Sequence, residues 1–98
     1  MAQAAKYQVK ITLLKRGVMR YYSQLDISRL LERAARRARL PVYFTKGFTP
    51  RMKMSFSAAL KLGVEGSITV TFYLTRQISP QFLRERLVPQ LPEGLEIT

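Results

Sequence analysis

Apolar and polar residues alternate in two long segments of the chain, and a period of two predicts half-buried β-strands. In residues 6–14, one side of the first strand carries the apolar residues Tyr7, Val9, Ile11 and Leu13. Residues 67–75 separate Ile68, Val70, Phe72 and Leu74 from the hydroxyl-bearing Thr69, Thr71 and Tyr73. We therefore expect a sheet with one face on the core. The expected residues of its open face are Gln8, Lys10, Thr12, Thr69, Thr71 and Tyr73.

A helical period replaces the alternation in residues 24–39, where one apolar stripe consists of Ile27, Leu30, Leu31, Ala34 and Ala38. Ser23 precedes this segment and is suited to cap the backbone amide of Asp26, whose carboxylate favours the positive end of the helix dipole. Pro41 ends the helix, because the residue before a proline is pushed out of helical geometry. The pattern predicts a helix over residues 24–39.

Shorter segments complete the expected fold. A second helix begins at the cap and first-turn pair Ser79–Pro80 and runs to about Leu87. The remaining extended segments are residues 19–22, 42–44, 54–60 and 95–98, and residues 45–53 form a loop. The order β-α-β-β-α-β predicts an α+β fold of the ferredoxin-like type, with two helices on one face of an antiparallel sheet.

The length of 98 residues is enough for a single domain over residues 1–98, since two independent cores would not fit. The last strand has barely begun where the chain ends. We therefore expect the chain to be the N-terminal part of a longer protein.

The charge of the chain narrows the choice of partners. Seventeen Lys and Arg residues oppose six Asp and Glu residues, which gives a net charge of +11. RNA or a ribonucleoprotein is the usual partner of so basic a domain, and an anionic membrane surface is the next candidate. The alternative without a partner is a surface that serves solubility, or a basic part of a more neutral protein.

Several kinds of chemistry lack the residues they need. The chain has no Cys and no His, so it has no thiolate, no iron–sulfur site and neither of the commonest metal ligands and bases. We expect no cofactor, no metal and no catalytic residues, although a mechanism that uses Lys or Tyr is an alternative. No apolar run reaches the ~20 residues of a membrane span, and residues 1–5 lack the long apolar core of a signal peptide, so we expect a cytoplasmic protein.

A second stripe on the first helix consists of arginines and lies opposite the apolar one: Arg29, Arg33, Arg36 and Arg37. Only Glu32 interrupts it. Like charges three or four residues apart on a helix cost a few tenths of a kcal/mol per pair, and an anionic partner would relieve this repulsion. The alternative is a face that is merely solvated.

The loop after the helix adds Lys46, Arg51 and Lys53 around the aromatic residues Tyr43 and Phe48. Cations that follow phosphates and rings that stack on bases suit single-stranded nucleic acid. We expect contacts with nucleic acid from Arg29, Arg33, Arg36, Arg37, Lys46, Phe48, Arg51 and Lys53. For Phe48 the alternative, which we favour slightly, is a core plug that folds the loop back onto the sheet.

Residues 6–97 also resemble a known family, most specifically over residues 23–64: the radical-SAM-linked domain of unknown function, which is found fused to or encoded beside radical S-adenosylmethionine proteins in bacteria. The most specific matches are Ser23, Leu25, Asp26, Leu40-Pro41, Gly47-Phe48, Pro50, Ser55-Phe56 and Leu62-Gly63. The chain departs from the family at Gln24, where relatives usually carry a histidine, and at Arg51 and Met52, where they often carry a His-Pro pair.

The resemblance implies the N-terminal half of such a domain, without the cysteines of the radical enzyme itself. It implies a module that presents RNA or a ribosomal substrate to a radical SAM enzyme. The alternative is a protein-docking adaptor for that enzyme, with no direct RNA contact. The sequence leaves the RNA, its sequence specificity and the oligomeric state open.

Overall fold

The structure, a computed structural model, describes residues 7–57 and 66–97. Within them the chain forms an α+β fold of two α-helices and a four-stranded antiparallel sheet. The strands and helices, in chain order, are β1 (Tyr7–Lys15), the 3-10 helix η1 (Gly17–Tyr21), α1 (Gln24–Arg37), β2 (Met54–Phe56), β3 (Gly66–Leu74), α2 (Pro80–Leu87), the 3-10 helix η2 (Val88–Gln90) and β4 (Leu95–Ile97).

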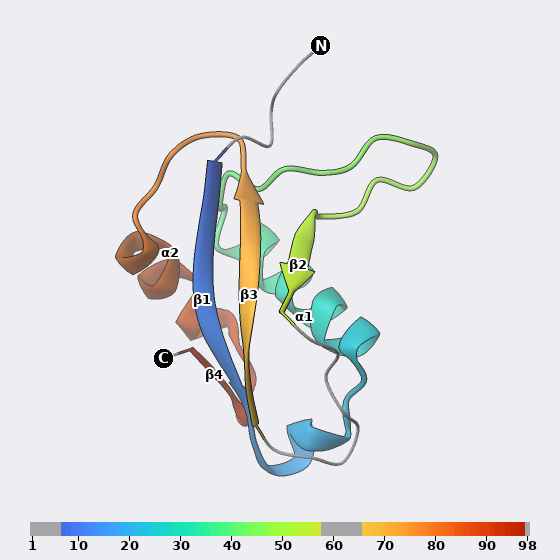
Figure 1. Ribbon diagram of the computed structural model, residues 1–98, viewed down its shortest axis with the longest axis vertical. Coiled ribbons are helices and arrows are strands. Elements are labelled where there is room, and N and C mark those ends of the chain that lie inside the picture. The colour runs from blue at the N-terminus through green and yellow to red at the C-terminus, as the bar shows by residue number, and fades with distance from the viewer. Residues whose placement is uncertain (1–6, 58–65, 98) are drawn as a thin grey trace.

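The two strands predicted from alternation, β1 and β3, form the centre of the sheet. They pair antiparallel along their whole length, from Tyr7 opposite Leu74 to Lys15 opposite Gly66. The short strands β2 and β4 flank them in the order β2-β3-β1-β4. Figure 1 shows the sheet in front of both helices, so α1 and α2 cover the same face. The opposite face is open, as predicted.

The core lies between the sheet and the two helices. Val9, Ile11, Val70 and Phe72 contribute from the sheet, and α1 contributes Ile27, Leu31, Ala34 and Ala35. The small Ala34 and Ala35 are almost fully buried, which lets α1 approach the strands closely. Leu83 and Leu87 seal the core from α2. Within residues 7–57 and 66–97, no helix combines the length and the apolar character that crossing a membrane requires.

Both ends of α1 are defined by local hydrogen bonds. Ser23 and Asp26 form a reciprocal capping box, in which each residue's backbone amide donates to the other's side chain at 3.1 Å. At the other end Leu40 N donates to Ala35 O and Arg39 N to Arg36 O, the pattern of a Schellman motif. Arg39 therefore adopts a left-handed conformation with a φ of 57°. The helix ends at Arg37, two residues before the predicted end.

Two predicted extended segments are wrong. Residues 42–44 form no strand, because their partner changes along the segment: Val42 bridges to Leu74 of β3, whereas Phe44 bridges to Met52. Residues 19–22 do not extend β1, because η1 turns the chain and buries Met19. Lys6, residues 58–60 and Thr98, which were assigned to strands, lie outside the described residues.

Candidate nucleic-acid interface

A basic groove lies between α1 and the loop at residues 45–51. Its volume is about 430 Å³, and its lining residues are Arg29, Glu32, Arg33, Arg36, Thr49, Pro50 and Arg51. We call it the arginine groove. Figure 1 shows why the two segments meet: the chain leaves the end of α1, runs out in a long excursion and returns toward β2 beside the helix. The groove thus joins four of the eight predicted contact residues.

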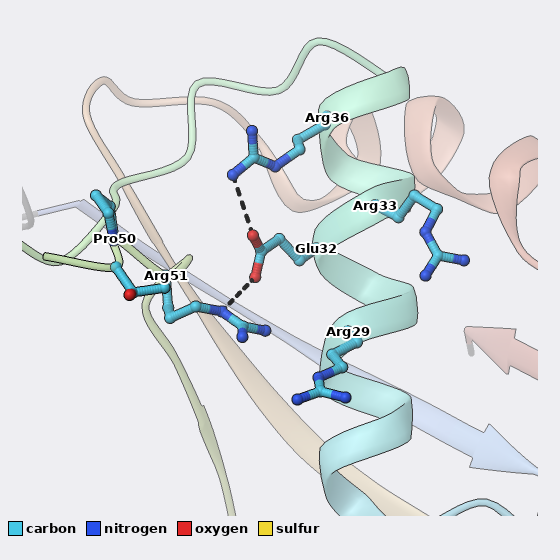
Figure 2. A pocket seen from close by; sticks show the side chains of 7 residues that line it. Arg29, Glu32, Arg33, Arg36, Pro50 and Arg51 are labelled. Carbon is cyan, nitrogen blue, oxygen red and sulfur yellow. Dashed lines mark hydrogen bonds and ion pairs between the residues drawn. The ribbon is translucent and has the colours of Figure 1, made fainter.

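Glu32 holds the two walls of the groove together. Its carboxylate accepts a hydrogen bond from Arg36 Nη2 at 3.1 Å and one from Arg51 Nε at 3.1 Å, each through a different oxygen. The second bond joins residues 19 positions apart. Only 15% of the Glu32 side chain is exposed, compared with 56% for Arg36 and 43% for Arg51. The geometry makes Glu32 the anchor between the loop and α1 (Figure 2).

The ionisation of Glu32 follows from the same contacts. Burial by itself raises the pKa of the carboxyl group. The hydrogen bond from Arg36, the charge and hydrogen bond of Arg51, and a backbone hydrogen bond from Met52 together outweigh burial and lower the pKa below 4.5. Glu32 is therefore a carboxylate at neutral pH, which keeps the pairing intact.

Further contacts fix the two paired arginines. The guanidinium of Arg36 lies over the ring of Phe44, 4.5 Å from its centroid. Arg51 is placed by its backbone, because its amide donates to Thr45 Oγ1 at 3.2 Å and its carbonyl accepts from Thr45 N at 2.8 Å. The paired arginines are thus held in position before any ligand arrives.

Arg29 and Arg33 are the exposed arginines of the groove that form no ion pair within the described residues. Hydrogen bonds from Ser23 lower the pKa of Asp26, and the charge of nearby Arg29 adds to that effect. Figure 2 shows Arg29 and Arg51 extending into the space beside Glu32, while Arg33 leaves the helix on another side and forms the outer margin. Both arginines remain available for an anion.

Phe48 is not a core plug, so that interpretation is wrong. Its side chain is fully exposed at the turn of the loop, with a relative accessibility of 107%. The hairpin around Thr45 and Arg51 holds the loop away from the sheet. Gly47 has a φ of 136°, which favours glycine and carries the chain through the turn. An apolar ring thus projects into solvent from the residue that precedes Thr49 of the groove wall.

The other predicted contact residues lie apart from the groove. Arg37 and Lys46 are exposed but do not line it. The Nζ atom of Lys53 sits 4.9 Å from the centre of the Tyr73 ring, which belongs to the open sheet face. Tyr43 is half-buried, and its backbone pairs with Tyr73 and Lys53. The predicted surface is therefore divided between the groove and the sheet.

The open sheet face is polar. The β1–β3 register places the predicted residues there, with Lys10 opposite Thr71, Gln8 opposite Tyr73 and Thr12 opposite Thr69. Lys53 covers one side of the Tyr73 ring, and the Tyr73 hydroxyl is 3.0 Å from Ser55 Oγ. Stacking of bases on this face, as in RNA-recognition modules, would need exposed rings on the central strands. Tyr73 is a poor platform for base stacking, because Lys53 already packs on its ring.

A second exposed surface was missed by the sequence analysis. Val18, Tyr21 and Leu25, on η1 and at the start of α1, are 68%, 56% and 53% exposed. We call it the apolar patch. The prediction of an extended segment over residues 19–22 concealed it, because alternation would have buried every second side chain. The absence of a helical period over so short a stretch left no signal for η1.

Among residues 7–57 and 66–97, no three His, Cys, Asp or Glu side chains gather into a group that could hold a metal ion. The chain belongs to the family described as uncharacterized protein conserved in bacteria (DUF2344), whose pattern matches residues 6–98. That description names no reaction. No curated protein and no solved structure matches the chain.

Proposed function

We propose that this member of the DUF2344 family is a non-catalytic module that binds RNA or a ribonucleoprotein through the arginine groove. The observation that carries the proposal is the composition of the groove: four arginines and one carboxylate line it, so it keeps a surplus of three positive charges. A concave surface with fixed guanidinium groups suits phosphate, to which arginine can donate two parallel hydrogen bonds.

The pairing of Arg36 and Arg51 with Glu32 leaves both able to bind phosphate. Each uses a single nitrogen for the carboxylate, Nη2 in Arg36 and Nε in Arg51. The guanidinium group has five N–H donors, so further donors remain on each side chain. Because Glu32 holds both groups in place, a phosphate meets arginines that have already lost part of their conformational freedom.

We further propose that the fold is the ferredoxin-like arrangement and that the module presents its RNA to a radical SAM enzyme. The strand order β2-β3-β1-β4, with both helices on one face, supports the first part. The resemblance of residues 6–97 to radical-SAM-linked domains supports the second part. In this arrangement the groove lies at the side of the sheet, which leaves the open face for other contacts.

Salt dependence of RNA binding tests the proposal. If ~5–8 phosphates of a single strand are neutralised, the logarithm of the association constant falls with the logarithm of salt concentration with a slope of about −3 to −6. Arg29→Gln with Arg33→Gln should reduce the steepness by roughly 1 to 1.5, since each lost phosphate contact removes about 0.7. The matched control is Arg76→Gln with Arg84→Gln, which removes two exposed arginines outside the groove. Affinity that does not change with salt would rule the proposal out.

The apolar patch favours a second function, a protein-docking adaptor for a radical SAM enzyme without RNA contact. Three large apolar side chains exposed within eight residues of the chain suit a protein contact. This function predicts that a pull-down of the enzyme survives nuclease treatment and is lost in Val18→Ser with Leu25→Ser. Loss of the enzyme on nuclease treatment, with the patch intact, favours RNA binding instead.

A further inference from the structure

The arginine groove and the loop turn together favour one form of RNA. Resting on the proposed function, we infer that the site takes a single-stranded segment, with a phosphate bound by Arg29 and Arg51 and an unpaired base stacked on Phe48. The inference starts from the position of Phe48. Its ring is fully exposed, and only two residues, Thr49 and Pro50, separate it from Arg51 in the groove wall. Their Cα atoms therefore lie at most about 11 Å apart, which a short single strand can bridge.

The arrangement discriminates against a duplex. In double-stranded RNA the flat faces of the bases are covered by their neighbours, so a projecting phenyl ring has no partner. In a single strand every base offers a face, and stacking on an aromatic residue tolerates any sequence. The ring of Phe48 thus gains nothing from duplex RNA, whereas the groove arginines attract both forms.

The loop is built to keep the ring exposed. The pairing of Thr45 with Arg51 closes its base, and the Arg51–Glu32 bond fixes that base to α1. Pro50, whose φ is restricted by its ring, lines the groove next to Arg51. A fixed loop loses little conformational entropy when a base stacks on its tip.

An anionic membrane is the other surface to which an exposed ring beside cations could bind. Two features favour RNA. The arginines line a hollow, which a flat membrane surface does not fill. The residues adjoining Phe48 at the turn are Gly47, which has no side chain, and Thr49, which adds little apolar area. A single phenyl ring buries too little apolar area to bind a membrane strongly.

The test measures binding of a fluorescein-labelled single-stranded RNA of about 12 nucleotides, a length within the usual range of such sites, and of the same strand annealed to its complement. Vesicles of phosphatidylserine and phosphatidylcholine are the third probe. The variants are Phe48→Ala, Phe48→Leu and Phe48→Tyr, with Phe82→Ala of α2, 42% exposed, as the matched control. Circular dichroism checks that each variant folds.

Wild-type protein should prefer the single strand, and Phe48→Ala should weaken single-strand binding by about 5- to 150-fold while duplex binding stays unchanged. Phe48→Tyr should retain the affinity, whereas Phe48→Leu should lose it, because leucine is apolar but cannot stack. Salt-dependent binding that is equal for both RNA forms and indifferent to Phe48 would overturn this inference and leave the proposed function standing. Binding to vesicles but to neither RNA would overturn both.

Discussion

At Gly94 the positions of two neighbouring backbones leave no room for a side chain. Its φ is 94°, and a Cβ atom placed there would lie 2.7 Å from the carbonyl oxygen of Arg16 and 2.8 Å from Met19 Cγ. The same segments are joined by a bond of 2.8 Å from Arg16 N to Gly94 O. The contact fixes the turn before β4 against the start of η1.

Gly94→Ala should therefore destabilise the protein by about 2–4 kcal/mol, because the left-handed conformation and the overpacking both cost free energy. The midpoint of urea unfolding measures the effect. Gly66→Ala is the matched control, since no atom of residues 7–57 and 66–97 lies within 4 Å of a Cβ added there, beyond its chain neighbours. Equal midpoints for the two variants would show that the segments separate more easily than their contacts indicate.

At Arg39 the backbone adopts a conformation that residues with a side chain disfavour. Its left-handed conformation is one that glycine adopts at the end of a helix without strain, while other residues lose on the order of 1 kcal/mol. Both hydrogen bonds of the Schellman motif form around it, and they offset the strain at the end of the helix. The position thus keeps a cation at a small cost in stability.

At the scale of elements, Glu32 connects the loop at residues 45–51 to α1, and this connection depends on pH. The pKa of Glu32 is below 4.5 in the folded protein, because its partners favour the carboxylate. A depressed folded pKa means that the stabilisation is fully present above the unfolded pKa and is lost as pH falls through the folded value. The connection therefore weakens in acid, below about pH 4.5.

Glu32→Gln should remove the contribution of this connection to the pH dependence of stability. Between about pH 6 and about pH 3 the free energy of unfolding of the wild type should fall more steeply than that of the variant, and chemical denaturation at several pH values measures the difference. Asp26 contributes equally to both proteins and cancels. Glu85→Gln is the control, because the Glu85 carboxylate, on the exposed surface of α2, accepts a hydrogen bond from Gln81 and from no other residue in the described part of the chain. Identical slopes for wild type and Glu32→Gln would contradict the role given to Glu32.

The elements differ in how far the sequence predicts them. β1, β3 and α1 repeat their hydrophobic period often enough to be identified from the sequence. The N-cap of α1, Ser23, lies three residues from its partner Asp26, so it can also be recognised locally. The segment from Val42 to Lys53 has no period, because its hydrogen bonds pass from β3 to its own hairpin. Its composition therefore indicated a strand where isolated bridges exist.

The candidate site divides in the same way. The helical period alone places Arg29, Arg33 and Arg36 on one face of α1. The contribution of Arg51 depends on a bond to Glu32 across 19 residues, which no local pattern contains. For Phe48, hydrophobicity favoured burial, whereas the hairpin that holds the ring outward is a tertiary feature.

For the molecule as a whole, the net charge of +11 acts on stability and on binding in opposite ways. Cations that repel one another weaken the folded state, while the same cations attract a polyanion. Arg33 is the clearest case, because Arg29 and Arg37 lie four residues before and after it on α1 and Arg36 lies three residues after it. Salt screens both effects.

Arg33→Gln should therefore raise stability by about 0.5 kcal/mol at low ionic strength, since glutamine is a good helix former and the like-charge pairs disappear. The gain should vanish at about 1 M salt, where the Debye length is only about 3 Å. Arg84→Gln lowers the net charge equally but has no cation three or four residues away on α2, so it should gain less. Urea unfolding at both salt concentrations makes the comparison. A gain in stability that coincides with weaker RNA binding would show that the arginine stripe is kept for the partner, whereas a loss of stability would indicate that Arg33 serves the fold.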